Sequence, residues 1–447
     1  MPDSSSPWWR SFDRRHWQVF LVSSLAWFFD CLDQQVFNQA RDGAVGDLIT
    51  TKARATEFAS YTTSYLLIGW AVGGFIFGAM GDRFGRARVL AVTLVLYSVG
   101  TGLSAFAPSY TVLCAFLVVT GLGIGGVFGL AVALVADSVP DKARAPALGM
   151  LQALSTVGNI AGGLIGLGVG LLIAASLLPF GLKGWQVLFL VGALPAFLCV
   201  FLLLRMPEPE KWVRARDEGL RRGIKFGSYR ELLGDRRWAR HAWAGLVMCC
   251  AGIIGLWGLG NFHPKIVGSI VDAHLSRTGL SASAFAGIKA HWIAIGLLMQ
   301  NIGGFVGMMV LSRIAQTKGR KPAFAIAIFL SFFFSQLAFR YMRDFSQIFW
   351  MLPLMGFGTL SVFAVYAIYL PELFPISLRS TGTSFCYNFG RLAAATAPFT
   401  IGILTKRLGG DIEGFRTAGL WVSLVLLLGL VALPFLPETK DQPLPED

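Results

Sequence analysis

Two carboxylates lie in the middle of the first strongly apolar run of the chain. Asp30 and Asp33 belong to the stretch "WFFDCLDQQVFNQARD", which runs from Trp27 to Asp42. A spacing of three residues places them on one face of a helix, in one polar stripe. Removal from water and a second acid nearby both disfavour the charged form of a carboxylate. Such a pair can bind and release a proton, or it can tie this helix to a neighbour.

A single arginine provides the opposite charge in the middle of another apolar run. Arg391 lies in "SFCYNFGRLAAATAP", residues 384–398. A guanidinium stays charged and offers a planar fork that suits a carboxylate. Arg391 can therefore hold an anion, or pair with Asp30 or Asp33 when no anion is present. A structural arginine that bonds helix-end carbonyls is the alternative.

Other polar and aromatic residues in apolar runs are candidates to line the same site. Their amides, hydroxyls and rings can contact a substrate, although in membranes such groups also bridge helices. The histidine of the set is a second candidate proton site or an interface residue. The set comprises Gln34, Asn38, Gln152, Asn159, Trp257, Asn261, His263, Gln300, Asn301, Tyr366, Tyr387 and Asn388.

The composition indicates a membrane protein. Of the 447 residues, 55% are hydrophobic and only 14% are charged, which is too little polar surface for a soluble multidomain protein. The net charge of +13 does not indicate nucleic-acid binding, because basic residues concentrate on one side of the expected topology, with 11 of them in residues 205–240. The six cysteines lack metal-ligand spacing. We expect no metal, no cofactor and no cleavable signal peptide.

Apolar runs predict the architecture, since about 20 such residues cross a hydrocarbon core of about 30 Å. We expect an all-α membrane protein with twelve transmembrane helices in two pseudo-symmetric six-helix bundles. The bundles are residues 17–204 and 241–436, joined by a cytoplasmic linker at 205–240, with cytoplasmic tails at 1–16 and 437–447. The spans lie near 17–40, 59–80, 88–107, 111–135, 146–174, 185–204, 241–268, 291–312, 323–340, 346–370, 381–404 and 417–436.

Three loop motifs recur in the two halves at nearly the same separation along the chain. "DSVPDKAR" at 137–144 and "ELFPISLR" at 372–379 share acid-x-x-Pro-x-x-x-Arg. "GRAR" at 85–88 and "GRKP" at 319–322 share Gly-Arg, and "MPEPEK" at 206–211 and "LPETK" at 436–440 share Pro-Glu. Repeated halves with a binding site between them at mid-membrane are a known transporter layout.

The loop "GAMGDRFGRARV" at 78–89 resembles the G-x-x-x-D-R-x-G-R signature of the major facilitator superfamily. The repeated acid-Pro-Arg loops and the "PETK" ending resemble its sugar-porter and metabolite:proton symporter branches. The resemblance covers residues 17 to 440 and implies the major facilitator fold.

The same resemblance implies that these loops latch the two bundles in one conformation, with plain topology anchoring as the alternative. In the second copy Gln316 stands where the aspartate would be, so we expect a weaker latch there. The candidate latch residues are Gly81, Asp82, Arg83, Gly85, Arg86, Asp137, Arg144, Glu372 and Arg379.

Two further motifs separate the branches. "DCLD" at 30–33 resembles the D-G-x-D motif of aromatic-acid and related metabolite:proton symporters, with Cys31 in place of glycine. This resemblance implies roles in proton coupling and substrate transport for Asp30 and Asp33, and the Gly-Arg pair that ends at Arg391 fits the same branch. "LVVTGLGIGG" at 117–126 departs from the sugar-porter pattern R-x-x-x-G-x-G-x-G, because Leu117 replaces the arginine.

We therefore predict a proton-coupled secondary active transporter, a symporter of a small organic anion such as a monocarboxylate or aromatic acid, that works by alternating access. The alternatives are a neutral sugar or polyol:proton symporter, an organic-cation transporter and, from another class, a non-transporting membrane sensor. An enzyme is not expected, since no P-loop, HExxH or G-x-S-x-G with partners is present. We expect a multi-pass protein of the cell membrane, in the lipid bilayer, with both termini cytoplasmic, no nucleic-acid partner and function as a monomer.

Overall fold

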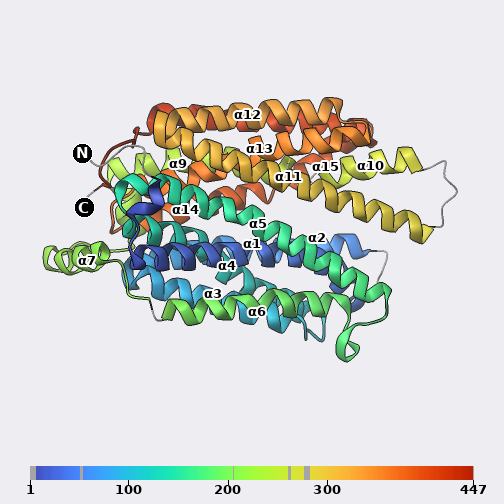
Figure 1. Ribbon diagram of the computed structural model, residues 1–447, viewed down its shortest axis with the longest axis horizontal. Coiled ribbons are helices and arrows are strands. Elements are labelled where there is room, and N and C mark those ends of the chain that lie inside the picture. Colours follow the sequence, from blue (N-terminus) through green and yellow to red (C-terminus); the bar gives the residue numbers. More distant parts are fainter. Residues whose placement is uncertain (1–6, 51–53, 205, 260–262, 276–281, 446–447) are drawn as a thin grey trace.

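The structure, a computed structural model, describes residues 7–50, 54–204, 206–259, 263–275 and 282–445. Within these ranges the side chains of residues 56, 174, 195–204, 257–258, 263, 282–284, 286 and 398–399 are not described. The described residues form helices and no strand, so the predicted all-helical architecture is confirmed. Long helices run side by side along the longest axis of the molecule (Figure 1).

The first half of the chain contains six long helices. They are α1 (Arg14–Leu48), α2 (Ala55–Phe84), α3 (Arg86–Ser104), α4 (Tyr110–Ser138), α5 (Asp141–Ala174) and α6 (Gly184–Leu204), with short 3-10 turns η1 (Trp8–Ser11) and η3 (Pro179–Gly181). The linker carries α7 (Glu210–Arg222) and α8 (Tyr229–Gly234).

The second half contains more helices because several of its spans are interrupted. Its elements are α9 (Arg236–Leu259), α10 (His263–Leu275), α11 (Ala282–Lys318), α12 (Arg320–Tyr341), α13 (Phe345–Tyr369), η5 (Leu370–Glu372), α14 (Arg379–Ala394), α15 (Ala397–Arg407), α16 (Ile412–Ser423), η6 (Leu424–Leu427), α17 (Leu428–Ala432) and η7 (Leu433–Phe435).

Nine helices within the described residues are long and apolar enough to cross a membrane. α1, which contains the buried Asp30 and Asp33, is not among them. The seventh expected span corresponds to α9 and α10, the eleventh to α14 and α15, and the twelfth to α16 through η7. Proline lies at the start of α10 and of α15, where its missing N–H costs no helical hydrogen bond. The nine spans are thus consistent with the predicted twelve.

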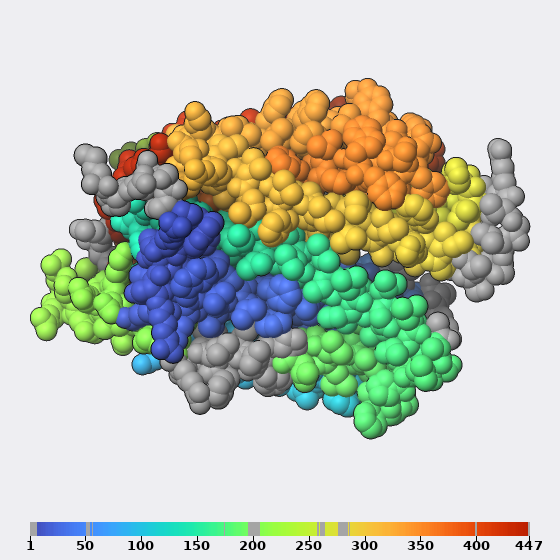
Figure 2. Space-filling view, in the orientation of Figure 1, coloured from blue at the N-terminus to red at the C-terminus, as the bar shows by residue number. Residues whose placement is uncertain are grey.

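The two halves lie side by side, and the linker helix α7 lies at the same end of the molecule as both ends of the described chain (Figure 1). In Figure 2 the blue-to-green first half and the yellow-to-orange second half form two layers, and α7 projects from one end. Large apolar side chains such as Leu164, Leu194 and Phe329 are more than half exposed on the outside. A bilayer would cover this surface.

Glycines let paired helices of each half approach until backbones touch. A Cβ on Gly73 of α2 would overlap the carbonyl oxygen of Leu122 in α4. In the second half, a Cβ on Gly303 of α11 would overlap the carbonyl oxygen of Pro353 in α13. Each glycine lies in the second span of its half and packs against the fourth, so the internal repeat predicted from the loops also holds for helix packing.

Gly73→Ala should therefore destabilise the protein, although alanine is otherwise the better helix former. Forcing α2 and α4 apart is overpacking, and we expect a cost of about 3 kcal/mol. The measurement is the midpoint of heat-induced aggregation in detergent. Gly170→Ala in α5 is the matched control, because a Cβ there meets nothing within 4 Å. Equal midpoints for the two variants would contradict the close α2–α4 contact.

The repeated Pro-Glu motifs cap helices in both halves. Glu208 accepts hydrogen bonds from the N–H groups of Ala87 (3.1 Å) and Arg88 (3.0 Å) at the start of α3. Glu438 accepts from those of Arg320 (2.8 Å) and Lys321 (3.0 Å) at the start of α12. Free N–H groups and the helix dipole both favour a carboxylate there. Each half is thereby closed on itself, the end of its last span bonded to the start of its third.

Candidate functional site

Arg391 is buried at the boundary between the halves, one turn after Tyr387 in α14. Its guanidinium carbon lies 3.7 Å from the centre of the Trp70 ring and 4.4 Å from that of Tyr387. Nη2 donates to the Tyr387 hydroxyl at 3.4 Å, whereas Nη1 is buried without a hydrogen-bond partner among the described residues. Among all the residues that the structure describes, no carboxylate oxygen lies within 4 Å of the nitrogen atoms of Arg391. The cation is thus flanked by aromatic rings and has bonding capacity to spare.

Asp30 faces this cation from α1. Its side chain is fully buried and interacts electrostatically with Arg391. Oδ2 accepts a hydrogen bond from Gln34 at 3.0 Å, and Oδ1 has no hydrogen-bond partner within the described ranges. A carboxylate and a guanidinium therefore approach each other from different halves without forming a close ion pair.

Asp33 points to different neighbours. Its Oδ2 accepts a hydrogen bond from the Thr101 hydroxyl of α3 at 3.0 Å. A Cβ on Gly192 of α6 would lie 2.9 Å from its Oδ1. The two aspartates were expected to share one stripe, but three residues advance a helix by about 300°, which leaves them about 60° apart. Asp30 faces the boundary between the halves, and Asp33 faces the interior of the first.

Aromatic rings continue away from Arg391. Tyr387 stacks on Phe128 of α4, with ring centres 3.8 Å apart and an angle of 20°. Phe128 in turn contacts Trp27 of α1 at 5.2 Å. Aromatic rings beside a cation and a carboxylate are groups that can contact a planar acid.

Two of the predicted lining residues donate hydrogen bonds to backbone carbonyls. Asn388 Nδ2 donates to Gly125 (3.3 Å) across the halves and to Ser384 (3.0 Å) within α14. Tyr366 donates to the Met248 carbonyl at 2.6 Å inside the second half. These contacts are the helix-bridging role that polar groups often take in membranes.

A second polar contact between the halves joins amide side chains of α5 and α11. Asn159 Nδ2 donates to Asn301 Oδ1 at 3.2 Å, and Gln152 donates to Ser155 at 3.4 Å. Gln300 is buried and Asn38 is exposed. Asn261 and the side chains of Trp257 and His263 lie outside the described residues.

The predicted latch residue Asp82 joins the two halves at the linker end. It accepts hydrogen bonds from the N–H groups of Ser380 (3.0 Å) and Thr381 (2.7 Å), and from the Thr381 hydroxyl at 2.7 Å. Because these N–H groups open α14, a carboxylate of the first half caps a helix of the second. Asp82 also pairs with Arg86 at 3.1 Å.

A buried chain of charges continues from there. Asp137 pairs with Arg86 Nε at 2.7 Å and, across the halves, with Arg379. Arg86 Nη2 also donates to the carbonyl of Ile376 in the second half at 2.7 Å. Charges this deeply buried need such partners.

The corresponding residues of the second copy make longer contacts between the halves. Gln316, where the repeat lacks its aspartate, donates to the Lys142 carbonyl at 3.3 Å. Arg144 pairs with Asp141 and lies 3.9 Å from Glu372, whose carboxylate is held by two bonds of 2.8 Å from Arg320. Of the remaining latch candidates, Gly81 is buried in the last turns of α2, Gly85 is buried at the turn after α2, and Arg83 is exposed.

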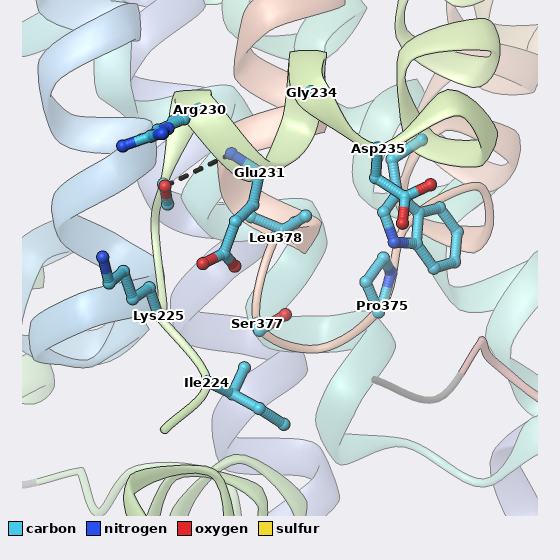
Figure 3. A pocket seen from close by; sticks show the side chains of 11 residues that line it. Ile224, Lys225, Arg230, Glu231, Gly234, Asp235, Pro375, Ser377 and Leu378 are labelled. Carbon is cyan, nitrogen blue, oxygen red and sulfur yellow. Dashed lines mark hydrogen bonds between the residues drawn. The ribbon is translucent and has the colours of Figure 1, made fainter. Parts of the chain in front are cut away.

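The linker also spans both halves, which the sequence did not reveal. Gly227 N–H donates to the Ser377 carbonyl of the second half at 2.9 Å. The Tyr229 hydroxyl donates to the Phe75 carbonyl of the first half at 2.7 Å. Between the linker and the 375–378 loop lies a pocket of about 440 Å³ with both acidic and basic side chains, including Lys225 and Glu231 (Figure 3). This pocket is separate from the Arg391 site.

Trp70 and Phe128 are the site residues that the sequence did not single out, since an aromatic residue in an apolar span has no distinctive signal. One signal was available for Trp70. It begins a row with Gly74, Gly78 and Gly81 on one face of α2, and each of these glycines faces α14 at Asn388, Ser384 or Ser380. A row of small residues at such spacing indicates a close helix interface.

Comparison with known proteins identifies the family of this chain. The family profile described as Major Facilitator Superfamily matches residues 46–304, and the one described as Sugar (and other) transporter matches residues 341–446. The cis,cis-muconate transport protein of Acinetobacter baylyi is 29% identical over 437 residues, which covers 96% of each chain. The niacin transporter of the same organism is 26% identical over 451 residues, 95% of this chain and 94% of that one.

Solved structures share the fold. The proton:xylose symporter XylE bound to 6-bromo-6-deoxy-D-glucose superposes with a TM-score of 0.71 at 18% identity, covering 96% of this chain and 98% of that chain. The human organic anion transporter MFSD10 gives a TM-score of 0.70 at 14% identity, covering 94% and 100%. With a family profile over more than half of its length, this chain belongs to the major facilitator superfamily and is a multi-pass membrane transporter, not an enzyme.

Proposed function

We propose that this transporter is a proton-coupled symporter of a small organic anion, a monocarboxylate or aromatic acid whose carboxylate binds Arg391. The observation that carries the proposal is a buried guanidinium with an unbonded Nη1 and no carboxylate within 4 Å among the described residues. The Trp70 and Tyr387 rings cover it. A planar carboxylate supplies the missing acceptors at the edge of the fork.

Asp30 supports the coupling half of the proposal. An ionised Asp30 competes with a substrate carboxylate for the charge of Arg391, whereas a protonated Asp30 does not. Proton loading would therefore prepare the cation for the anion, and release of both on the other side would restore the empty pair. One proton with one monoanion makes the cycle electroneutral. Asp33 is the second acid of the proposed proton-coupling pair. Its carboxylate accepts a hydrogen bond from Thr101.

The contacts between the halves support alternating access. They run from Trp70 and Arg391 to the proposed latch at Asp82, along the part of α2 that lies nearest the linker. The conformation is thus closed at the linker end. With the linker and both termini placed in the cytoplasm of a cell-membrane protein, this end faces inward. The proposed bundles, 17–204 and 241–436, then rock about a site at mid-membrane, and one chain contains a complete pathway.

The relatives support an acid over a sugar. Two of them carry cis,cis-muconate and niacin, which are planar carboxylic acids. A neutral sugar or polyol is the second candidate, favoured by the Sugar (and other) transporter profile over residues 341–446. Leu117 opposes it, because a buried leucine lies where the sugar-porter pattern has an arginine.

Replacing Arg391 tests the proposal. Proteoliposomes would be assayed for uptake of labelled benzoate and xylose under an inward proton gradient. Arg391→Gln should lower benzoate uptake about 100-fold, since losing one partner of a buried charge pair costs roughly 2–5 kcal/mol. Arg391→Lys should recover part of it, because lysine keeps the charge but not the fork.

Arg416→Gln is the matched control. Arg416 is another buried arginine, but it bonds the carbonyls of Phe339 (3.1 Å) and Met342 (2.6 Å), so benzoate uptake should persist. Xylose uptake that survives Arg391→Gln would instead make this chain a sugar carrier and Arg391 a structural residue.

A further inference from the structure

The stacking of Arg391 on Trp70 joins the two halves of the transporter. Trp70 belongs to α2 of the first half, and Arg391 to α14 of the second. The guanidinium carbon lies 3.7 Å from the ring centre, and both side chains are buried. The one cation proposed to bind substrate is therefore also part of the contact that holds α2 against α14.

Each partner is fixed within its own half. A Cβ on Gly125 of α4 would overlap the Trp70 carbonyl, so the backbone of Trp70 is packed directly on α4. On the other side, a Cβ on Gly390, the residue before Arg391, would lie 3.1 Å from the backbone of Cys249 in α9, so this part of α14 is packed directly on the second half. Neither partner can follow the other far, and separating α2 from α14 must break the Trp70–Arg391 stack.

The strength of this stack depends on the charge of Arg391. A cation–π interaction is electrostatic, and it is strongest for a desolvated cation with no anion beside it. A substrate carboxylate at the edge of the guanidinium would offset that charge and weaken the attraction of the ring. Two states that differ in this contact are then biased by substrate, which is what coupling between binding and conformation requires.

We propose that Trp70 is the residue that couples substrate binding to opening of the linker end. It holds α2 on α14 while Arg391 is empty and releases them when a carboxylate occupies Arg391. This proposal rests on the proposed function of Arg391. It assigns Trp70 a positioning role and no direct part in proton transfer.

The test measures the linker end directly. Spin labels would be attached at Lys142 and Lys318, which are exposed at the ends of α5 and α11 in the two halves, in a chain whose six cysteines are replaced. Distance distributions would be recorded by double electron–electron resonance with and without benzoate. In the otherwise unchanged protein, the two labels should be a short distance apart without benzoate. Benzoate should produce a mixture of short and long distances between them.

Trp70→Leu should show the long distance without benzoate, with the open-to-closed ratio raised about tenfold, as expected for loss of a desolvated cation–π contact. Benzoate should add little further opening. Trp70→Phe keeps an aromatic face and should lie between. Trp421→Leu replaces an exposed tryptophan of α16 and should match the unchanged protein. A closed Trp70→Leu that still opens with benzoate would overturn the proposal.

Failure of the underlying function has a different signature. If Arg391 does not bind the carboxylate, Arg391→Gln will retain benzoate affinity by equilibrium binding, and that result overturns the substrate assignment. If Arg391 binds the carboxylate but Trp70 is only packing, affinity will be lost in Arg391→Gln while Trp70→Leu keeps the benzoate-dependent distance change. The two proposals therefore fail separately.

Discussion

Asp30→Asn should bind benzoate with an affinity that no longer changes with pH. In the wild type, raising the pH ionises Asp30, which then competes with the substrate carboxylate for Arg391. Opposite charges in a protein environment attract by about 2 kcal/mol at roughly 8 Å, so wild-type affinity should fall roughly 30-fold across the titration. Asparagine resembles the protonated acid, and Asp30→Asn should keep the high affinity at every pH.

Transport should separate into two behaviours in the same variant. Exchange of internal for external benzoate should continue, because a neutral residue 30 accompanies the bound anion in both directions. Accumulation driven by an inward proton gradient should be lost, because no coupled proton is carried. The measurements are equilibrium binding over a pH series, counterflow, and gradient-driven uptake in proteoliposomes.

Asp33→Asn is the informative comparison, since it makes the same chemical change nearly one helical turn away. Asp33 bonds Thr101 inside the first half and does not face Arg391, so its variant should keep pH-dependent binding. If the dependence on pH persists in Asp30→Asn and disappears in Asp33→Asn, the coupled proton belongs to Asp33 instead.

Asp137→Asn should open the linker end of the transporter. Asp137 lies between two buried guanidiniums, Arg86 of its own half and Arg379 of the other. Loss of one partner from a buried ion network costs about 3–5 kcal/mol because charge is left uncompensated. The halves can relieve that cost by separating, which lets water reach both arginines. We expect the balance between closed and open states to shift by at least about 100-fold.

Labelling of a buried cysteine measures this shift. In a cysteine-free background, Ser384→Cys places a thiol where α14 packs on Gly78 and Gly129. Its reaction with a polar maleimide should accelerate about 100-fold when Asp137→Asn is added. Asp141→Asn is the control, because Asp141 pairs with Arg144 from an exposed position and exposed pairs contribute little. Equal labelling rates in the two variants would contradict a latch at Asp137.

The charged parts of this molecule could be predicted from the sequence, and the apolar parts of the same site could not. Asp30 and Arg391 stood out because a charge within an apolar run needs an explanation, and Asp82 stood out because its loop resembles a family signature. Trp70 and Phe128 did not, since an aromatic residue in a transmembrane helix is compatible with lipid, core or site. Their roles depend on which helix lies opposite, and only the fold supplies that.

Polar residues show the converse limit. Asn388 and Tyr366 were candidates either to line the site or to bridge helices, and they bond carbonyls of Gly125 and Met248. Side-chain type indicates that a partner is needed and not which partner is nearest. Asp33 makes the same point, because a modest difference in direction around α1 sends it to Thr101. The repeat in the loops, in contrast, correctly indicated equivalent helix packing in the two halves.

The glutamates at 208 and 438 have a mechanical consequence. Each glutamate joins the end of the sixth span of its half to the start of the third. The helices of one half therefore cannot easily slide past one another, and the half moves as a rigid body. A rigid body that rotates acts as a stiff lever. A small displacement beside Arg391 is then magnified at the far ends of α5 and α11, where a substrate must enter or leave.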